Sequence, residues 1–163
     1  MLMFRIYRFI GGYKDTVFSK IKRGLMPACV VMAVSLYSAG RADEKPYAPE
    51  TIDGVVVVTA EEAIELILEN PAMPIIDSRK KTEYLKGHIE GATSMLNTEM
   101  TEQHLQEVAD DKDAAILFYC NGIRCLRSTD AIRKAKAWGY TNLVWFRGGW
   151  DEWTDKNLPV VAD

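Results

Sequence analysis

The uniformly apolar run from Ala114 to Tyr119 limits the possible folds more than any other segment. Such a run is typical of a strand that is buried on both faces, and strands of this kind occur in the centre of parallel sheets. Other apolar runs alternate along the chain with segments of helical periodicity. This alternation predicts an α/β domain in which helices flank a central, mainly parallel sheet.

The boundaries of several expected elements can be read from local signals. Val55 to Val58 is a β-branched run typical of a strand, and Thr59 with Glu62 forms a capping box that begins a helix. Asn70-Pro71 ends that helix, and Gly139 ends a later one. We expect strands at 55–58, 74–76, 92–96, 114–119 and 143–146, and helices at 59–69, 82–86, 101–109, 126–138 and in a short segment that carries Trp150 and Trp153.

The first 42 residues differ in character from the rest of the chain. Residues 1–24 are basic, residues 25–39 form an uncharged and mostly apolar run, and small residues follow. This order is the pattern of a secretory signal peptide. An uncleaved membrane anchor is the alternative, although a span needs about 20 residues and Pro27 interrupts the run. We therefore expect an exported protein, periplasmic or equivalent, that contacts a membrane only if the leader is retained.

These patterns divide the chain into three parts. Residues 1–42 form the leader, residues 43–53 a proline-containing linker, and residues 54–163 a single domain. Residues 1–42 carry seven Lys or Arg and one acidic residue, whereas the remaining residues carry thirteen Lys or Arg and twenty-two Asp or Glu, a net charge of -9. This acidic body argues against nucleic acid as a partner, because phosphate binding rests on clustered positive charge.

Cys120 directly follows the apolar run and precedes the helix expected at 126–138. The carboxyl ends of parallel strands are where open α/β sheets place their ligands. Turn amides that converge on the sulfur, the helix N-terminus, and the charges of Arg124 and Arg127 would all favour the thiolate. These features predict an activated nucleophile in an anion-binding loop. A buried and inert thiol is the alternative.

Five stretches, taken in order, resemble the family of single-domain rhodaneses, which are sulfurtransferases. Each is weak alone, but together they extend over roughly residues 54–160, nearly all of the expected domain. The resemblance implies a rhodanese-like fold. The matching stretches are 75–79, 87–92, 118–128, 139–143 and 147–153.

The resemblance also implies a chemistry for the cysteine loop. Cys120 would attack the outer sulfur of thiosulfate or a similar donor and hold it as a persulfide, which splits the transfer into two covalent steps. A thiophilic acceptor, which is cyanide in assays and a thiol or a protein in the cell, would then take the sulfur. No metal and no organic cofactor is implied.

Donor binding is implied by the same resemblance. Loop amides would stabilise the anionic sulfur, and arginines would steer the small anionic donor. Arg79 follows the strand at 74–76 together with Asp77, and it either forms a buried ion pair with Asp77 or lines the site. The expected substrate-binding residues are Asn121, Gly122, Ile123, Arg124, Cys125, Arg127 and Arg79.

The cysteine loop departs from the commonest pattern of this family. Its glycine comes two residues after Cys120, where three is more usual, and Cys125 closes the loop where serine or threonine often stands. The loop resembles a subgroup that reads Cys-Asn-Gly-Pro-x-Cys, with Ile123 in place of the proline. Cys125 is either a substitute for the helix N-cap residue or a thiol that resolves the persulfide on Cys120.

Both histidines have ordinary structural explanations. His88 lies between Gly87 and Gly91, so we expect a histidine held by hydrogen bonds in a tight turn, with a general base as the alternative. His104 lies in an acidic helix and is expected to be solvated. A Cys/His zinc spacing is absent from the sequence.

Two other functions fit the same fold. Phosphatases and arsenate reductases that resemble rhodaneses need an arginine six residues after the cysteine, but that position here is Leu126. The smaller loop suits a sulfur atom better than a phosphate. The second alternative is a non-catalytic sulfur- or redox-sensing module with a disulfide between Cys120 and Cys125.

Overall fold

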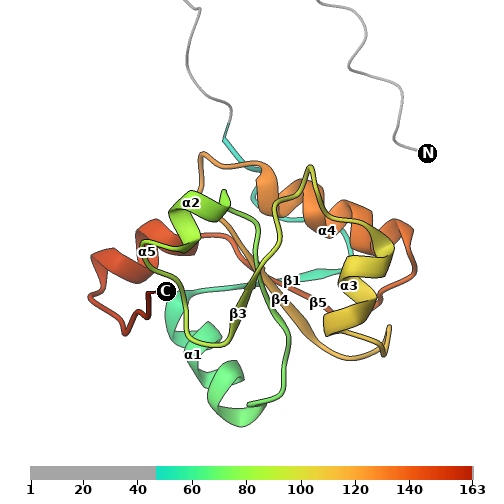
Figure 1. Cartoon of the computed structure of the whole chain (residues 1–163), viewed down its shortest axis with the longest axis horizontal. Helices are drawn as coiled ribbons and strands as arrows, with labels where there is room; N and C mark the ends of the chain where they lie inside the picture. Colours follow the sequence, from blue (N-terminus) through green and yellow to red (C-terminus); the bar gives the residue numbers. More distant parts are fainter. Residues whose placement is uncertain (1–46, 163) are drawn as a thin grey trace, which may run out of the picture. The chain divides into compact units, whose positions relative to one another are not determined.

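The computed structural model describes residues 47–162, which form one five-stranded parallel sheet with helices on both faces (Figure 1). The predicted α/β fold is thereby confirmed. The leader predicted at 1–42 and the first four residues of the predicted linker lie outside the described residues. The elements, in chain order, are β1 (Val55–Val58), α1 (Ala60–Glu69), β2 (Ile75–Asp77), α2 (Lys81–Tyr84), β3 (Ala92–Ser94), α3 (Glu102–Val108), β4 (Ile116–Tyr119), α4 (Arg127–Ala137), β5 (Leu143–Phe146) and α5 (Gly149–Asp155).

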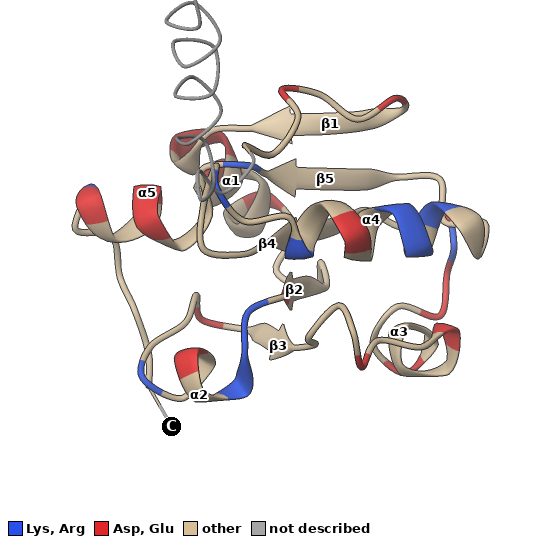
Figure 2. Ribbon diagram, turned by 90° about the horizontal axis from the view of Figure 1, so that it is seen from above, with Lys and Arg blue, Asp and Glu red and all other residues tan. Residues whose placement is uncertain are grey.

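The strand order in the sheet is β1-β5-β4-β2-β3, so the apolar run that ends at Cys120 is the central strand (Figure 2). Successive side chains of a strand point to opposite faces of the sheet. Ile116 and Phe118 accordingly pack in the core cluster that includes α3 and α4. Leu117 and Tyr119 pack on the other face, in the cluster that includes α1, α2 and Trp153 of α5. Burial on both faces explains why β4 has no charged residue.

The helix and strand boundaries follow the local signals closely. Thr59 accepts a hydrogen bond from the amide of Glu62, and the Glu62 carboxylate accepts one from the amide of Thr59, so the predicted capping box is confirmed. The strand expected at 92–96 is shorter than predicted. It ends at Ser94 because its neighbour β2 ends at Asp77, the residue that pairs with Ser94.

Residues 47–53 pack against the domain, contrary to the linker prediction for this stretch. Ala48 is buried, and its amide donates to the carbonyl of Ile123 at 2.8 Å. The guanidinium of Arg147 donates to the carbonyls of Ala48 and Pro49 at 3.0 and 2.8 Å. Proline and charge content suggested a linker, but residues 47–53 form a strap beside the cysteine loop. Between residues 47 and 162, no helix is long and apolar enough to span a membrane.

Candidate active site at the cysteine loop

Cys120 lies at the carboxyl edge of the sheet, directly after the central strand. Its neighbours across the sheet are the ends of β2 and β5, because Tyr119 pairs with both Asp77 and Phe146. Residues 120–126 form the connection to α4, and the side chain of Cys120 is only 1% exposed. The position of the thiol is thus the one expected from the sequence, but the thiol is deeply buried.

The start of α5 holds the backbone of the loop. The amide of Trp150 donates to the carbonyl of Cys120 at 2.8 Å, and the amide of Asp151 donates to the carbonyl of Asn121 at 2.7 Å. This close approach requires a glycine at position 149, where φ is +56° and where a Cβ would collide with the Cys120 carbonyl oxygen. The motif 147–150 therefore fixes the strand end that carries the thiol.

Gly149→Ala is expected to destabilise the domain more than Gly91→Ala. Both glycines have positive φ, so both variants incur a strain of about 1–2 kcal/mol. Gly91 has no atom within 4 Å of an added Cβ, whereas Gly149 meets the Cys120 backbone, and this overpacking adds at least about 1 kcal/mol. Denaturant unfolding of both variants measures the difference. Equal losses of stability would contradict the close approach.

The sulfur of Cys120 is held from two sides. It donates to the carbonyl of Cys125 at 3.3 Å, and its Sγ lies 3.0 Å from the hydroxyl of Ser128. Trp145 Nε1 donates to that same hydroxyl oxygen at 3.0 Å. An indole N–H can only donate, so the Ser128 hydrogen is available for the Cys120 sulfur. Ser128 and Trp145 thus fix the orientation of the thiol.

Cys125 brings a second thiol into contact with the first. Both cysteines are reduced, and the Cys120 thiol donates to the backbone carbonyl of Cys125, so the two residues lie against each other. The neighbouring Cys120 thiol, with the backbone amides of Arg127 and Asn121 and the nearby Arg127 charge, lowers the pKa of Cys125 to about 6, although burial opposes this. The contact with Cys125 and burial together raise the pKa of Cys120, and the hydroxyl and amide of Ser128 only partly oppose this.

Against the expectation of a Cys120 thiolate, burial and the contact with Cys125 raise the pKa of Cys120, whereas the loop amides and Arg127 favour the thiolate at Cys125. The sequence argument placed the converging amides on the residue at the strand end. In the structure, amides of the loop and of the first turn of α4 meet Cys125, which is half-buried, whereas Cys120 is desolvated beneath it. The two thiols share one proton, so they titrate as a pair.

Both arginines of the loop have protein partners. Arg127 Nη1 lies 2.9 Å from Glu83 Oε2 and 3.0 Å from Asn121 Oδ1, and the Asn121 amide donates to Glu83 Oε1 at 2.8 Å. Although burial opposes it, the hydrogen bond from Asn121 and the charge of Arg127 lower the pKa of Glu83. Arg124 stacks over the ring of Tyr47 at 4.2 Å. A donor anion must compete with these contacts.

Arg79 is an interior residue, and its predicted place among the substrate-binding residues is not supported by its contacts. It is 2% exposed, and its guanidinium lies 2.6 Å from the carboxylate of Asp77, which is fully buried. The same guanidinium donates to the carbonyl of Gly87 and stacks 4.1 Å from the ring centre of Trp150. Of the two roles left open by the sequence, the structure places Arg79 in the buried ion pair.

The remaining loop residues surround the thiols. The amide of Cys125 donates to the carbonyl of Gly122 at 2.9 Å, which closes a turn. A Cβ on Gly122 would lie 2.7 Å from a carboxylate oxygen of Asp151, so that carboxylate borders the loop. Burial, then the charge of Asp155, raises the pKa of Asp151. Ile123 is exposed, and its carbonyl binds the 47–53 strap.

Ser128, Trp145 and Glu83 contact the residues of the cysteine loop but were not predicted from the sequence. Ser128 lies in the first turn of α4, one turn after Cys125, and this spacing could have indicated it; no local signal indicates Trp145 or Glu83.

His88 is buried, contacts the carbonyl of Tyr84 through Nδ1 at 3.1 Å and stacks on the Tyr84 ring. The structural interpretation of His88 is therefore confirmed.

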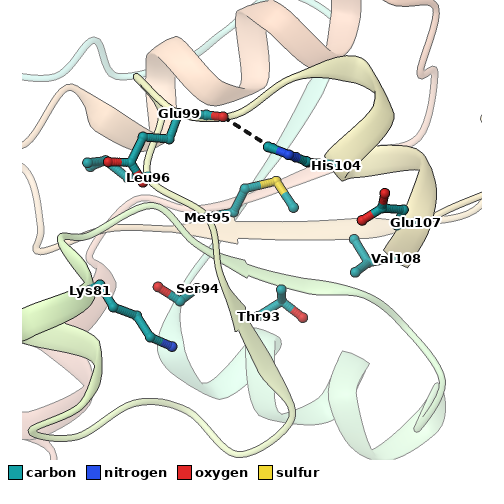
Figure 3. Close-up of a pocket in the computed structure, with 9 residues that line it drawn as sticks. All are labelled: Lys81, Thr93, Ser94, Met95, Leu96, Glu99, His104, Glu107 and Val108. Atoms are coloured by element: carbon teal, nitrogen blue, oxygen red, sulfur yellow. Dashed lines mark hydrogen bonds between the residues drawn. The ribbon is translucent and has the colours of Figure 1, made fainter.

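A separate cavity of roughly 360 Å³ lies at the β3 edge, between α2 and α3 (Figure 3). None of the residues that line it belongs to the cysteine loop. His104 on its wall contacts the carbonyl of Glu99 at 3.2 Å. Among residues 47–162, no group of three His, Cys, Asp or Glu side chains is arranged to hold a metal ion.

Comparison with known proteins agrees with this fold. Residues 59–156 match the model of the rhodanese-like domain. YibN of Escherichia coli strain K12 is 30% identical over 108 residues, which cover 66% of this chain and 73% of YibN. The tRNA uridine(34) hydroxylase of Erwinia tasmaniensis is 30% identical over 109 residues, but these cover only 29% of that protein. The crystal structure of a thiosulfate sulfurtransferase from Pseudomonas aeruginosa shares the fold, with a TM-score of 0.56 and 24% sequence identity. The match covers 66% of this chain and 20% of that chain.

Proposed function

We propose that this chain, which belongs to the rhodanese-like domain family, is a sulfurtransferase that carries sulfane sulfur as a persulfide on Cys120. The observation that supports this most strongly is the thiol pair at the end of the central strand. Cys120 is fixed by Ser128 and Trp145, and it lies in contact with a thiol of low pKa. We further propose that the domain extends over residues 54–163, beyond the residues 59–156 that match the family model.

The first step uses the proton that the two thiols share. Cys120 attacks the outer sulfur of thiosulfate while its proton passes to the Cys125 thiolate, the bond between the two donor sulfurs breaks, and sulfite leaves with the electron pair. Cys125 thus acts as the general base for Cys120. The loop amides and Arg127 that favour charge on Cys125 would also stabilise negative charge on the outer sulfur of the neighbouring persulfide.

The second step returns the loop to its starting state. The acceptor, cyanide in an assay or a thiol or protein thiol in the cell, attacks the outer sulfur. Cys120 leaves as a thiolate and takes the proton back from Cys125. Because the sulfur is transferred between thiols and anions, the chemistry requires no metal and no organic cofactor.

We also propose that the protein acts after export, in the periplasm or an equivalent compartment. The support is the sequence pattern of residues 1–42, which combines a basic start, an apolar run and small residues. In such a compartment disulfides persist. The sensing alternative, with both loop cysteines as a redox pair, is favoured by the same contact between the thiols.

The test is a steady-state assay with thiosulfate and cyanide, with a phosphate ester run in parallel. A sulfurtransferase forms thiocyanate over many turnovers and releases no phosphate. Inorganic polysulfide serves as a second donor, because the contacts of Arg124 and Arg127 leave the donor class open. No thiocyanate from either donor would exclude the proposed transfer. Phosphate release that depends on Cys120 would favour a phosphatase.

A further inference from the structure

We infer that Cys125 is a second catalytic thiol, which resolves the Cys120 persulfide by attack on its inner sulfur, releases hydrosulfide and closes a Cys120–Cys125 disulfide. This inference rests on the proposed function, since it needs the persulfide to form. It assigns to the site a second outcome, sulfide release, for conditions in which no acceptor is present.

The first support is the position of the two sulfurs. The turn closed by the Cys125 amide and the Gly122 carbonyl folds the loop back on itself. As a result the backbone carbonyl of Cys125 accepts from the Cys120 thiol at 3.3 Å, which places the two cysteines against each other, and both are reduced. A helix N-cap role for Cys125 is not what the structure shows, because the residue at the start of α4 is Leu126, which makes no side-chain cap.

The second support is the unequal environment of the two thiols. Cys120 is buried and is held by Ser128, whereas Cys125 is half-buried and receives the amides of Asn121 and Arg127. These amides, and the charge of Arg127, do not depend on the state of Cys120. The interaction with the Cys120 thiol, which lowers the pKa of Cys125 most, changes when Cys120 becomes a persulfide, and burial opposes the charge, but the amides and Arg127 still favour the thiolate, which is the reactive form.

The resolving step balances without an outside oxidant. The proton that Cys125 accepted during loading passes to the outer sulfur of the persulfide. The Cys125 thiolate then forms a bond to the Cys120 sulfur, the bond between Cys120 and the outer sulfur breaks, and hydrosulfide leaves with the electron pair. The sulfane sulfur is reduced, and the two thiols are oxidised to one disulfide. An external thiol or dithiol must then supply two electrons to reopen the loop.

The two fates of the persulfide compete with each other. An acceptor that reaches the outer sulfur first receives it, and the loop stays reduced. Without an acceptor, the disulfide forms and stops further loading until a reductant arrives. The oxidation state of the two cysteines therefore depends both on the supply of sulfur donors and on the supply of reducing thiols. One cycle then contains both the transferase and the sensing alternatives.

The experiment loads the reduced full chain with thiosulfate or with inorganic polysulfide, without oxygen and without acceptor. Every variant carries Cys29→Ser, so that no third thiol is present. Intact mass, peptide mapping and the sulfide released are measured for this background and for the added substitutions Cys120→Ser, Cys125→Ser and Cys125→Ala. Two substitutions at position 125 guard against a loop that one of them disturbs.

The expected result is that the background protein loses two hydrogens, shows a 120–125 disulfide and releases up to one sulfide per chain. Both Cys125 variants lack the base for loading, so they gain the added sulfur on Cys120 more slowly, but they retain it and release no sulfide. A background protein that keeps the added sulfur, with no disulfide and no sulfide, would overturn the inference and leave the proposed function standing. If neither the background protein nor any variant gains sulfur, forms the disulfide or releases sulfide, the proposed function itself is overturned.

Discussion

Cys120→Ser is expected to reduce thiocyanate formation from thiosulfate by at least about a thousandfold, because a residue that forms the covalent intermediate has no substitute in the loop. A serine hydroxyl is a poor acceptor of sulfane sulfur, and Cys125 lacks the support of Ser128 and Trp145 that orients Cys120. Steady-state rates at saturating thiosulfate and cyanide measure the loss.

Cys29→Ser is the matched control for this substitution. It makes the same chemical change at a thiol of the predicted leader, and the rate is expected to stay at that of the unsubstituted chain. Thermal unfolding of both variants shows whether the fold is intact. If Cys120→Ser folds and retains more than about a tenth of the rate, Cys120 is not the sulfur carrier.

Asp77→Asn is expected to destabilise the domain by about 3–5 kcal/mol, because it leaves the Arg79 guanidinium buried without a counter-charge. The carboxylate also accepts a hydrogen bond from Tyr119 at 2.7 Å. At 2% exposure, Arg79 cannot reach water without opening the packing of Trp150 above it. Thermal unfolding is expected to show a fall in Tm of roughly 10 °C or more.

Glu102→Gln is the control, since it breaks the exposed pair with Lys112. Surface pairs contribute at most about 1 kcal/mol, so its Tm is expected to change little. A double variant, Asp77→Asn with Arg79→Met, is expected to recover part of the loss because the unpaired charge is gone. Equal effects of Asp77→Asn and Glu102→Gln would contradict a structural role for the buried pair.

The fold could be predicted from the sequence because its signals are local and agree with one another. The apolar run before Cys120, the capping box at Thr59 and the stop at Gly139 each depend on a few adjacent residues, and each is found in the structure. The position of Cys120 at the sheet edge follows directly from these elements. The length of β3 could not be predicted from the sequence, because β3 ends where its partner β2 ends.

The electrostatics of the site could not be predicted in the same way. Which sulfur receives the loop amides depends on how the 120–126 segment turns, and that turn depends on α5 through Gly149 and on the strap through Ile123. The partner of Arg127 is Glu83, a residue of α2 that is 44 positions away in the sequence. Contacts between residues so far apart in the sequence cannot be recognised from the spacing of residues within the motif.

The role of Arg79 is decided by contacts that its position in the sequence does not specify. A charged residue directly after a buried strand is compatible with a ligand site and with a buried pair. Only the packing of Asp77, Gly87 and Trp150 around the guanidinium distinguishes these roles. The sequence left both roles open for that reason.

The shared proton of Cys120 and Cys125 is tested most directly by titrating the thiols of the reduced Cys29→Ser chain. Ultraviolet thiolate absorbance is followed against pH, and brief alkylation at neutral pH is mapped to the residue. We expect one thiolate to appear as the pH rises through about 6, with Cys125 alkylated first. We expect the second thiol to stay protonated above the ordinary cysteine pKa of about 8.5, because Cys120 is buried against its partner. Two thiols that titrate together near the ordinary value, or alkylation of Cys120 before Cys125, would contradict the shared proton.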